Sequence, residues 1–331
     1  MLFKRLAIGL GIYLVVLFSV AGVMVSCFHP DAPKALHSVT DPFASMDLSN
    51  LPSLRRYRAR DGAELSYREY PGRSIQVVVL VHGSAGSSQD MHIMARALQE
   101  QSGATVLVPD IRGHGANLPH GDIAHVGQLD DDMTDFVQAV RPQHAGKKWT
   151  LLGFSSGGGF VLRIAGSGAG NLFDRFILLS PYLRYNAPTV RPTSTRNNTG
   201  EGSSWYSVSI ARIIGLSIFD FFGIHSFDGL PVLSFPVPTN IQATTSSYSF
   251  RMQKNFEPHS DYRADIRNVT RPMQVFVGGS DELFIPEQFP KVFSADRKDV
   301  QVSILPGMCH SDMITKPAAI SAVVKAVEQT S

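Results

Sequence analysis

A regular alternation of strand-like and helix-like segments most constrains the fold of this chain. The apolar run at residues 75–81 has the composition of a strand that is buried on both faces of a parallel sheet. Further strand-like runs lie at residues 105–109, 149–152, 176–180, 273–277 and 300–305, with helix-like runs at 91–101, 126–140, 160–165 and 318–327. The order predicts an α/β fold, with a mostly parallel central sheet, right-handed crossovers and helices on both faces.

The alternation is interrupted once, between residues 183 and 270. This stretch contains Ser/Thr/Asn/Gly-rich pieces around an apolar and aromatic segment at 210–224. We expect a cap insertion (183–270) lying over the carboxyl edge of the sheet, where open α/β sheets bind ligands. The host domain should extend over residues 54–331, beginning with a hairpin at 54–70. Residues 28–53 contain several prolines without a clear hydrophobic period and are predicted to be a linker.

The N-terminal segment is long enough to span a membrane. Lys4 and Arg5 precede about 20 residues without charge, from Leu6 to Val25. We predict a transmembrane anchor or signal segment over residues 1–27. The basic pair favours a cytoplasmic amino end and a catalytic domain on the extracytoplasmic side, which in a bacterium is the periplasmic side of the inner membrane. A lipoprotein modified at Cys27 and a secreted protein with a cleaved signal are the alternatives.

The pentapeptide Gly153-Phe154-Ser155-Ser156-Gly157 has the form Gly-x-Ser-x-Gly and lies between a strand-like and a helix-like run. In a sharp turn of this kind the serine backbone is strained and its neighbours must be small. The strain exposes the serine hydroxyl above the N-terminus of the following helix, which stabilises negative charge. The pattern therefore indicates a nucleophilic Ser155.

Composition excludes several other classes of site. A formal charge of +2, with basic residues scattered along the chain, gives no reason to expect nucleic acid as a partner. Two cysteines, Cys27 and Cys309, provide neither a disulfide framework nor a four-ligand metal site. The acidic run 130–132 is expected to form a solvated face near a helix N-terminus rather than a metal site. We expect no metal and no organic cofactor.

A serine nucleophile needs a base, and the base needs a group that orients it. His310 follows the last predicted strand and is the expected base. Asp281 follows the preceding strand and is the expected acid, ahead of three competitors, Asp312, Asp265 and Asp261. The chain order Ser, Asp, His is that of the α/β-hydrolases.

Five segments in this order resemble the α/β-hydrolase superfamily over residues 54–328, and in particular its monoglyceride lipase and lysophospholipase-like branch. The segments are His82–Gly86, Asp110–Gly115, Gly153–Gly157, Gly279–Asp281 and His310. The resemblance implies an oxyanion hole made by the backbone N–H groups of Ser84 and Ser156, and a lid formed by the insertion. His82 is expected to brace the oxyanion loop and His114 to be a turn residue.

The sequence thus predicts a membrane-associated serine hydrolase that cleaves carboxylic esters through an acyl-enzyme, using Ser155, His310 and Asp281. An apolar cap near a membrane favours lipid-like small-molecule substrates such as monoacylglycerol or lysophospholipid. The alternatives are other chemistry on the same fold (peptidase, thioesterase, lactonase or cofactor-free haloperoxidase) and a binding module on a catalytically retired hydrolase fold.

Overall fold

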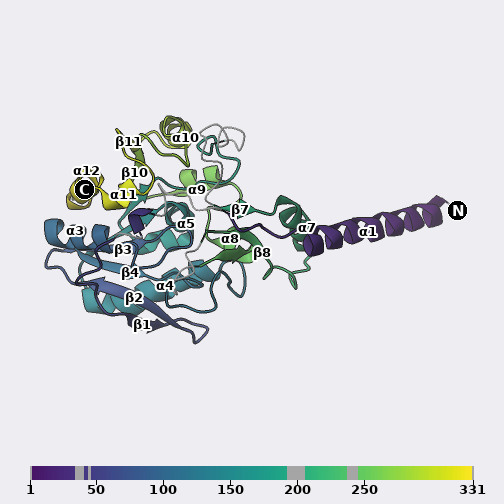
Figure 1. Ribbon diagram of the computed structural model, residues 1–331, viewed down its shortest axis with the longest axis horizontal. Helices are drawn as coiled ribbons and strands as arrows, with labels where there is room; N and C mark the ends of the chain where they lie inside the picture. Colours follow the sequence, from purple (N-terminus) through teal and green to yellow (C-terminus); the bar gives the residue numbers. More distant parts are fainter. Residues whose placement is uncertain (1, 34–40, 44–45, 192–205, 237–244, 330–331) are drawn as a thin grey trace.

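The central element of the fold is an eight-stranded sheet, seen in a computed structural model that describes residues 2–33, 41–43, 46–191, 206–236 and 245–329 (Figure 1). The strand order is β1-β2-β4-β3-β5-β6-β10-β11, and β2 alone runs against the other seven. The strands are β1 (Arg55–Arg58), β2 (Glu64–Tyr70), β3 (Gln76–Val81), β4 (Thr105–Pro109), β5 (Lys148–Phe154), β6 (Arg175–Leu179), β10 (Met273–Gly278) and β11 (Gln301–Leu305).

Helices cover both faces of this sheet because its central strands are apolar on both sides. In β3, Val77 and Val79 join one hydrophobic core while Val78 and Leu80 join the other. The first core is closed by α4 (Gln128–Val140), α5 (Ser156–Ala165), α9 (Tyr262–Asn268) and α10 (Gln288–Asp296). The second is closed by α3 (His92–Ser102), α11 (Asp312–Thr315) and α12 (Pro317–Glu328). The predicted α/β fold with a mostly parallel sheet is confirmed.

Strands β6 and β10 are direct neighbours in the sheet, although the segment predicted as an insertion separates them in sequence. That segment contains a second sheet, in the order β7-β8-β9, which lies on the side of the domain nearest the N-terminal helix (Figure 1). Its elements are β7 (Ser207–Val208), α7 (Ile210–Phe221), β8 (Pro231–Ser234), β9 (Ser247–Ser249) and α8 (Phe250–Asn255), followed by α9. Residues 192–205 and 237–244 of the predicted insertion lie outside the described part of the chain.

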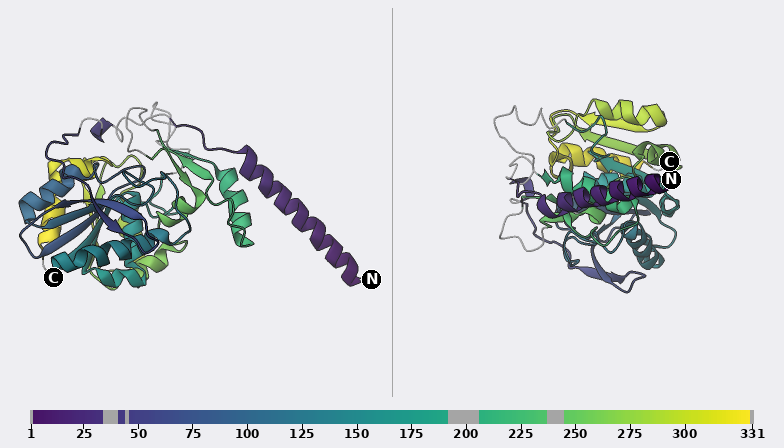
Figure 2. Two further views of the ribbon diagram at one scale, coloured as in Figure 1. Left: turned by 90° about the horizontal axis from the view of Figure 1, so that it is seen from below. Right: turned by 90° about the vertical axis from the view of Figure 1, so that its right-hand side faces the viewer.

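The N-terminal segment forms one long helix, α1 (Leu2–Cys27), that projects away from the domain (Figure 2). Its carboxyl-terminal part packs against α7, and Ala21 and Val25 join a small hydrophobic cluster with residues of α7, β8 and α8. The stretch from Phe3 to Cys27 has the length and apolar composition needed to cross a membrane, properties that it shares with signal sequences.

Candidate active site

The Gly-x-Ser-x-Gly motif forms a strained turn between β5 and α5. Ser155 has φ 56° and ψ −121°, a backbone conformation that is costly for a residue with a side chain. A Cβ atom added at Gly153 would lie 2.3 Å from the carbonyl oxygen of Gly157. One added at Gly157 would lie 2.2 Å from the carbonyl oxygen of His82. The turn can therefore form only with glycine at both positions.

The structure brings the three residues of the predicted triad together at the carboxyl edge of the sheet. Nε2 of His310 lies 3.0 Å from Oγ of Ser155, and Nδ1 of His310 lies 2.8 Å from Oδ2 of Asp281. All three side chains are buried. The imidazole is flanked by the rings of Phe154 and Phe284, which limit its rotation.

Asp281 is held in its ionised form despite complete burial. Its Oδ1 accepts hydrogen bonds from the backbone N–H groups of Leu283, at 2.9 Å, and Phe284, at 3.1 Å. Burial alone would raise the pKa of this carboxyl group. The adjacent His310, together with hydrogen bonds that include one from Ser180, instead lowers the pKa below its ordinary value. A charged Asp281 can stabilise a protonated His310.

The three competing carboxylates have other partners. Asp312 accepts a hydrogen bond from the backbone N–H of Cys309. Asp261 caps α9 through the N–H of Ala264, and Asp265 pairs with Nδ1 of His259 at 2.7 Å. Of the four acids considered, Asp281 is the one in contact with His310.

The two residues predicted to form the oxyanion hole are neighbours. Oγ of Ser84 lies 2.5 Å from Oγ of Ser156, so the loop after β3 lies beside the start of α5. Ser156 is the first residue of that helix, where a backbone N–H has no acceptor within the helix. The positive end of the α5 dipole therefore lies next to the Ser155 hydroxyl.

Two buried histidines connect the loops around this site. Nδ1 of His82 donates to the carbonyl oxygen of Gly83, and Nε2 accepts a hydrogen bond from the backbone N–H of Ile111. His82 therefore braces the loop after β3 against the turn after β4, as expected from the sequence. Burial lowers the pKa of His114 well below its usual value, and the nearby His82 adds to that effect. His114 is consequently neutral.

Tyr248 of β9 completes this network. Its hydroxyl lies 2.6 Å from Nε2 of the neutral His114 and donates to it, while its oxygen accepts the backbone N–H of Ala85 at 2.7 Å. Burial raises the pKa of the Tyr248 hydroxyl, so the proton needed for this arrangement is retained. The small second sheet is thereby connected to the loop that carries Ser84.

The acidic run at the start of α4 is not the solvated face that the sequence suggested. Asp132 is buried and forms two 2.7 Å hydrogen bonds with Arg112. The side chain of Asp130 accepts from Arg163 of α5 at 2.8 Å, and Asp131 pairs with Arg60. The expectation was wrong because arginines from three separate segments converge on this turn, a long-range effect that local sequence does not show.

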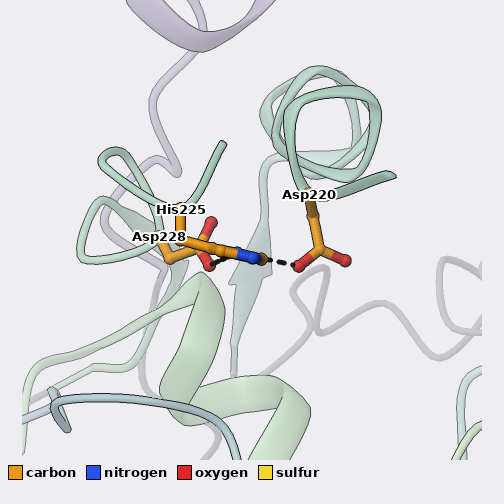
Figure 3. A group of neighbouring side chains, drawn as sticks. All are labelled: Asp220, His225 and Asp228. Carbon is orange, nitrogen blue, oxygen red and sulfur yellow. Dashed lines mark hydrogen bonds and ion pairs between the residues drawn. The ribbon is translucent and has the colours of Figure 1, made fainter. Parts of the chain in front are cut away.

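A group of three possible metal ligands lies away from the serine, at the end of α7 (Figure 3). The ligand atoms of Asp220, His225 and Asp228 all lie within 4.8 Å of one another. Nδ1 of His225 is 3.1 Å from Asp228 and 3.3 Å from Asp220, and the amine of Lys254 is 2.7 Å from Asp220. Because Lys254 already forms an ion pair with Asp220, these side chains are accounted for as polar contacts that hold the loop together.

The cysteines have no part in the site chemistry. Cys27 and Cys309 are free thiols. Burial and the neighbouring carboxylates Glu282 and Asp312 raise the pKa of the Cys309 thiol, which keeps it protonated and weakly nucleophilic.

Three residues near the site were not found by sequence reasoning: Ser180, Glu282 and Tyr248. Ser180 follows β6 with a φ of 39° and contacts Asp281, so its place directly after a strand was an available signal. Glu282 accepts the backbone N–H of His310 at 2.8 Å and lies beside the acid in sequence. Tyr248 has no local signal, because its partners lie 134 and 163 residues away.

Comparison with known proteins identifies hydrolases among the proteins that resemble this chain. The family model "Serine aminopeptidase, S33" matches residues 72–212, which is less than half of the chain. The zebrafish (Danio rerio) protein named sn-1-specific diacylglycerol lipase ABHD11 is 30% identical over 129 residues, which are 38% of this chain and 39% of that protein. The chain thus spans about two fifths of the length of the curated relatives it matches.

Solved structures are similar over most of the domain. A soluble variant of monoglyceride lipase from Saccharomyces cerevisiae superposes with a TM-score of 0.62 at 17% identity, covering 86% of this chain and 96% of that one. The monoacylglycerol lipase of Paleococcus ferrophilus gives a TM-score of 0.55 at 18% identity, covering 80% and 99%. The chain has the α/β-hydrolase fold, and it resembles the lipase-like serine hydrolases of that superfamily.

Proposed function

We propose that this protein is a membrane-tethered serine hydrolase that cleaves carboxylic esters with Ser155, His310 and Asp281. The observation that carries the proposal is the continuous hydrogen-bonded chain from Asp281 through both nitrogens of His310 to Oγ of Ser155. The base thus contacts the nucleophile, and the acid contacts the base, as a catalytic triad requires.

The reaction proceeds in two halves. As Oγ of Ser155 attacks the ester carbonyl carbon, Nε2 of His310 takes the hydroxyl proton, and Asp281 stabilises the imidazolium. Collapse of the tetrahedral intermediate breaks the bond to the alcohol oxygen, which leaves with the proton from His310. Water, deprotonated by the same imidazole, then attacks the acyl-enzyme and releases the carboxylic acid and free Ser155.

The negative charge of each tetrahedral intermediate needs donors that are in place before the reaction. We assign this role to the backbone N–H groups of Ser84 and Ser156. The contact between their hydroxyl groups supports the assignment, since it holds the two loops at a fixed separation. The start of α5 adds the favourable end of a helix dipole.

Lipid-like esters are the substrate class that the chain favours. Its relatives include proteins named as lipases of mono- and diacylglycerol. The apolar α1 supports a site of action at a membrane, with Lys4 and Arg5 favouring an extracytoplasmic domain. The insertion 183–270 would act as the lid, and monoacylglycerol or lysophospholipid would be the acyl donors.

The proposal is tested with the full chain in detergent and a series of p-nitrophenyl esters of increasing acyl length. Ser155→Ala should abolish turnover of every ester, whereas Ser294→Ala, at an exposed position on α10, should not change it. An optimum at medium or long acyl chains would support lipid-like substrates. Near wild-type turnover by Ser155→Ala would exclude the assignment.

A peptidase is the second candidate, because the matching family model is described as a serine aminopeptidase. Amide and ester substrates with the same acyl group separate the two functions. The esterase proposal predicts a higher kcat/KM for the ester and no selective cleavage of peptide amides with a free amino terminus. Efficient release of N-terminal residues from peptides would favour the second candidate.

A further inference from the structure

The carboxyl-terminal end of α1 packs against α7 in an antiparallel helix pair. The rings of Phe18 and Phe219 stack with centroids 5.8 Å apart. Further along α1, and nearer the start of α7, Nε of Arg212 donates to the carbonyl oxygen of Val25 at 2.9 Å. The end of α7 therefore lies beside the interior of α1, and the beginning of α7 lies beside the end of α1. Figure 1 shows the two helices in contact at this end of the domain.

The pairing is close and specific. A Cβ atom at Gly215 would lie 2.8 Å from the carbonyl oxygen of Ala21, so glycine is what allows the two backbones to approach. Arg212 is buried and also donates to the carbonyl oxygen of Pro231 at 2.9 Å. Its cation lies at the carboxyl end of α1, where the helix dipole favours positive charge. The end of α1 is thus fixed to the domain rather than attached as a loose tether.

Several large apolar side chains remain exposed next to this pair. They are those of five residues of α7 and the loop that follows, which we call the α7 face: Ile210, Ile214, Phe221, Phe222 and Phe227. Phe221 is 83% exposed and Ile210 is 67% exposed. Ile210, Ile214 and Phe221 recur at helical spacing and so lie on one face of α7. An exposed apolar face of this kind marks a contact site for protein or lipid.

Polar contacts keep the aromatic loop in place. Lys254 forms an ion pair with Asp220, close in sequence to Phe221 and Phe222. His225 contacts both Asp220 and Asp228 (Figure 3). Between Arg212 and Asp220, α7 carries no charged residue. The phenylalanines are therefore presented outward by a fixed loop.

The position of α1 identifies what covers the α7 face. Phe18, which contacts the end of α7, precedes Val25 by seven residues, or about 10 Å along a helix axis. Both residues belong to the stretch with the composition of a membrane span. Helix α7 runs antiparallel to α1 over this distance. The end of α7 therefore lies at the level of the apolar span of α1, not beyond the carboxyl end of that span.

We infer that the α7 face is a second membrane contact, which enters the same lipid bilayer that α1 crosses. The inference rests on the proposed function in one respect, the use of α1 as a membrane tether. It adds that the tether and the α7 face enter the membrane as one unit, which fixes the orientation of the domain on the lipid surface.

The test places one fluorescent probe at a time in the full chain, with Cys27 and Cys309 replaced by serine. An environment-sensitive NBD group is attached at Phe221→Cys, at Val16→Cys within α1, or at Tyr185→Cys, an exposed position of the domain. The proteins are reconstituted in phosphatidylcholine vesicles that contain a spin-labelled phosphatidylcholine. We expect quenching at position 221 within twofold of that at position 16, and no quenching at position 185.

The possible failures are distinguishable. Quenching at position 16 together with a water-like signal at position 221 would overturn the inference and leave the tether intact. Absence of quenching at both positions would overturn the tether and the inference together. A blue-shifted but unquenched probe at position 221 would show that protein, such as a second copy of the chain, covers the α7 face instead of lipid.

An activity measurement provides an independent readout. Phe221→Asp should lower hydrolysis of a long-chain ester embedded in vesicles at least 5-fold. Turnover of a water-soluble short ester should stay unchanged, because the Phe221 ring is 83% exposed and its ring contact is with Phe222 rather than with the triad. Tyr185→Asp is the matched control and should affect neither. Equal activity of Phe221→Asp and Tyr185→Asp on the embedded ester would contradict the inference.

Discussion

The hydroxyl of Tyr248 lies 2.6 Å from Nε2 of His114 and thereby joins a strand of the predicted insertion to the turn after β4. The same hydroxyl accepts the N–H of Ala85, the residue that follows Ser84. Thr245 makes a second connection: its backbone N–H donates to the carbonyl oxygen of Ala85 at 3.3 Å, and its hydroxyl donates to the carbonyl oxygen of Gly113. The loop that we assign to the oxyanion hole is thus supported by two residues from a segment that lies far away in sequence.

Tyr248→Phe should lower kcat on a soluble ester roughly 10- to 100-fold, because small displacements of catalytic groups have effects of this size. It leaves the buried N–H of Ala85 without its acceptor, at a cost of about 1–3 kcal/mol in the free energy of unfolding. Tyr248 is a positioning residue, so kcat should fall more than KM rises. Steady-state kinetics and thermal melting test this, with the exposed Tyr185→Phe as the control. Unchanged kcat in a destabilised variant would assign Tyr248 a structural role alone.

Asp281→Asn should lower kcat roughly 10³- to 10⁴-fold, as removal of the orienting charge does in other serine hydrolases. The amide can donate to Nδ1 of His310, which favours the tautomer that cannot accept the Ser155 proton at Nε2. Asp312→Asn is the matched control, because Asp312 lies two residues from His310 in sequence but accepts its hydrogen bond from the backbone N–H of Cys309 and not from the imidazole. A comparable loss in both variants would contradict the role of Asp281.

Glu257 is expected to make stability depend on pH. Burial raises the pKa of Glu257 to about 7, although Arg184, Arg163 and Lys254 act in the opposite direction. In the unfolded chain the group titrates near its ordinary value of 4.5. Between these two values the folded state holds a proton that the unfolded state has lost, so the contribution of Glu257 to stability decreases as the pH rises from about 4.5 to about 7.

Glu257→Gln removes this titration. The Tm of the variant, relative to that of the wild type, should therefore increase between pH 4.5 and pH 7.5. Each pKa unit corresponds to about 1.4 kcal/mol. The free energy of unfolding of the variant, relative to that of the wild type, should therefore rise by roughly 3 kcal/mol over this pH range. Thermal melting of both proteins at several pH values measures it. A Tm difference that is constant across this range would contradict the prediction.

The sheet was predictable because its strands are continuous apolar runs between helical patterns. Predicted strand 105–109 coincides with β4, and 75–81 differs from β3 by one residue. Helix α4 begins at Gln128 rather than 126 because Gly127, with a φ of 102°, is not helical. The placement of Ser155, Asp281 and His310 follows from chain order, since loops after parallel strands meet at one edge of the sheet.

What could not be predicted depends on contacts between distant segments. The pairing of Asp132 with Arg112 and of Asp130 with Arg163 has no local sequence pattern. The contacts of Tyr248 and the packing of α1 on α7 also have no local sequence pattern. In the sequence, nothing distinguishes Gly215, which allows α1 and α7 to approach, from another glycine in an apolar helix. Such contacts become visible only when the chain is folded.

The most direct test of the central claim is covalent labelling of the full chain with a fluorophosphonate probe, followed by peptide mass mapping. The proposal predicts a stoichiometric adduct on Ser155, its loss in Ser155→Ala, and much slower labelling in His310→Ala, where the base is missing. Ser294→Ala should be labelled like the wild type. An unlabelled Ser155 in the folded wild-type protein, or an adduct that maps to another residue, would contradict the account.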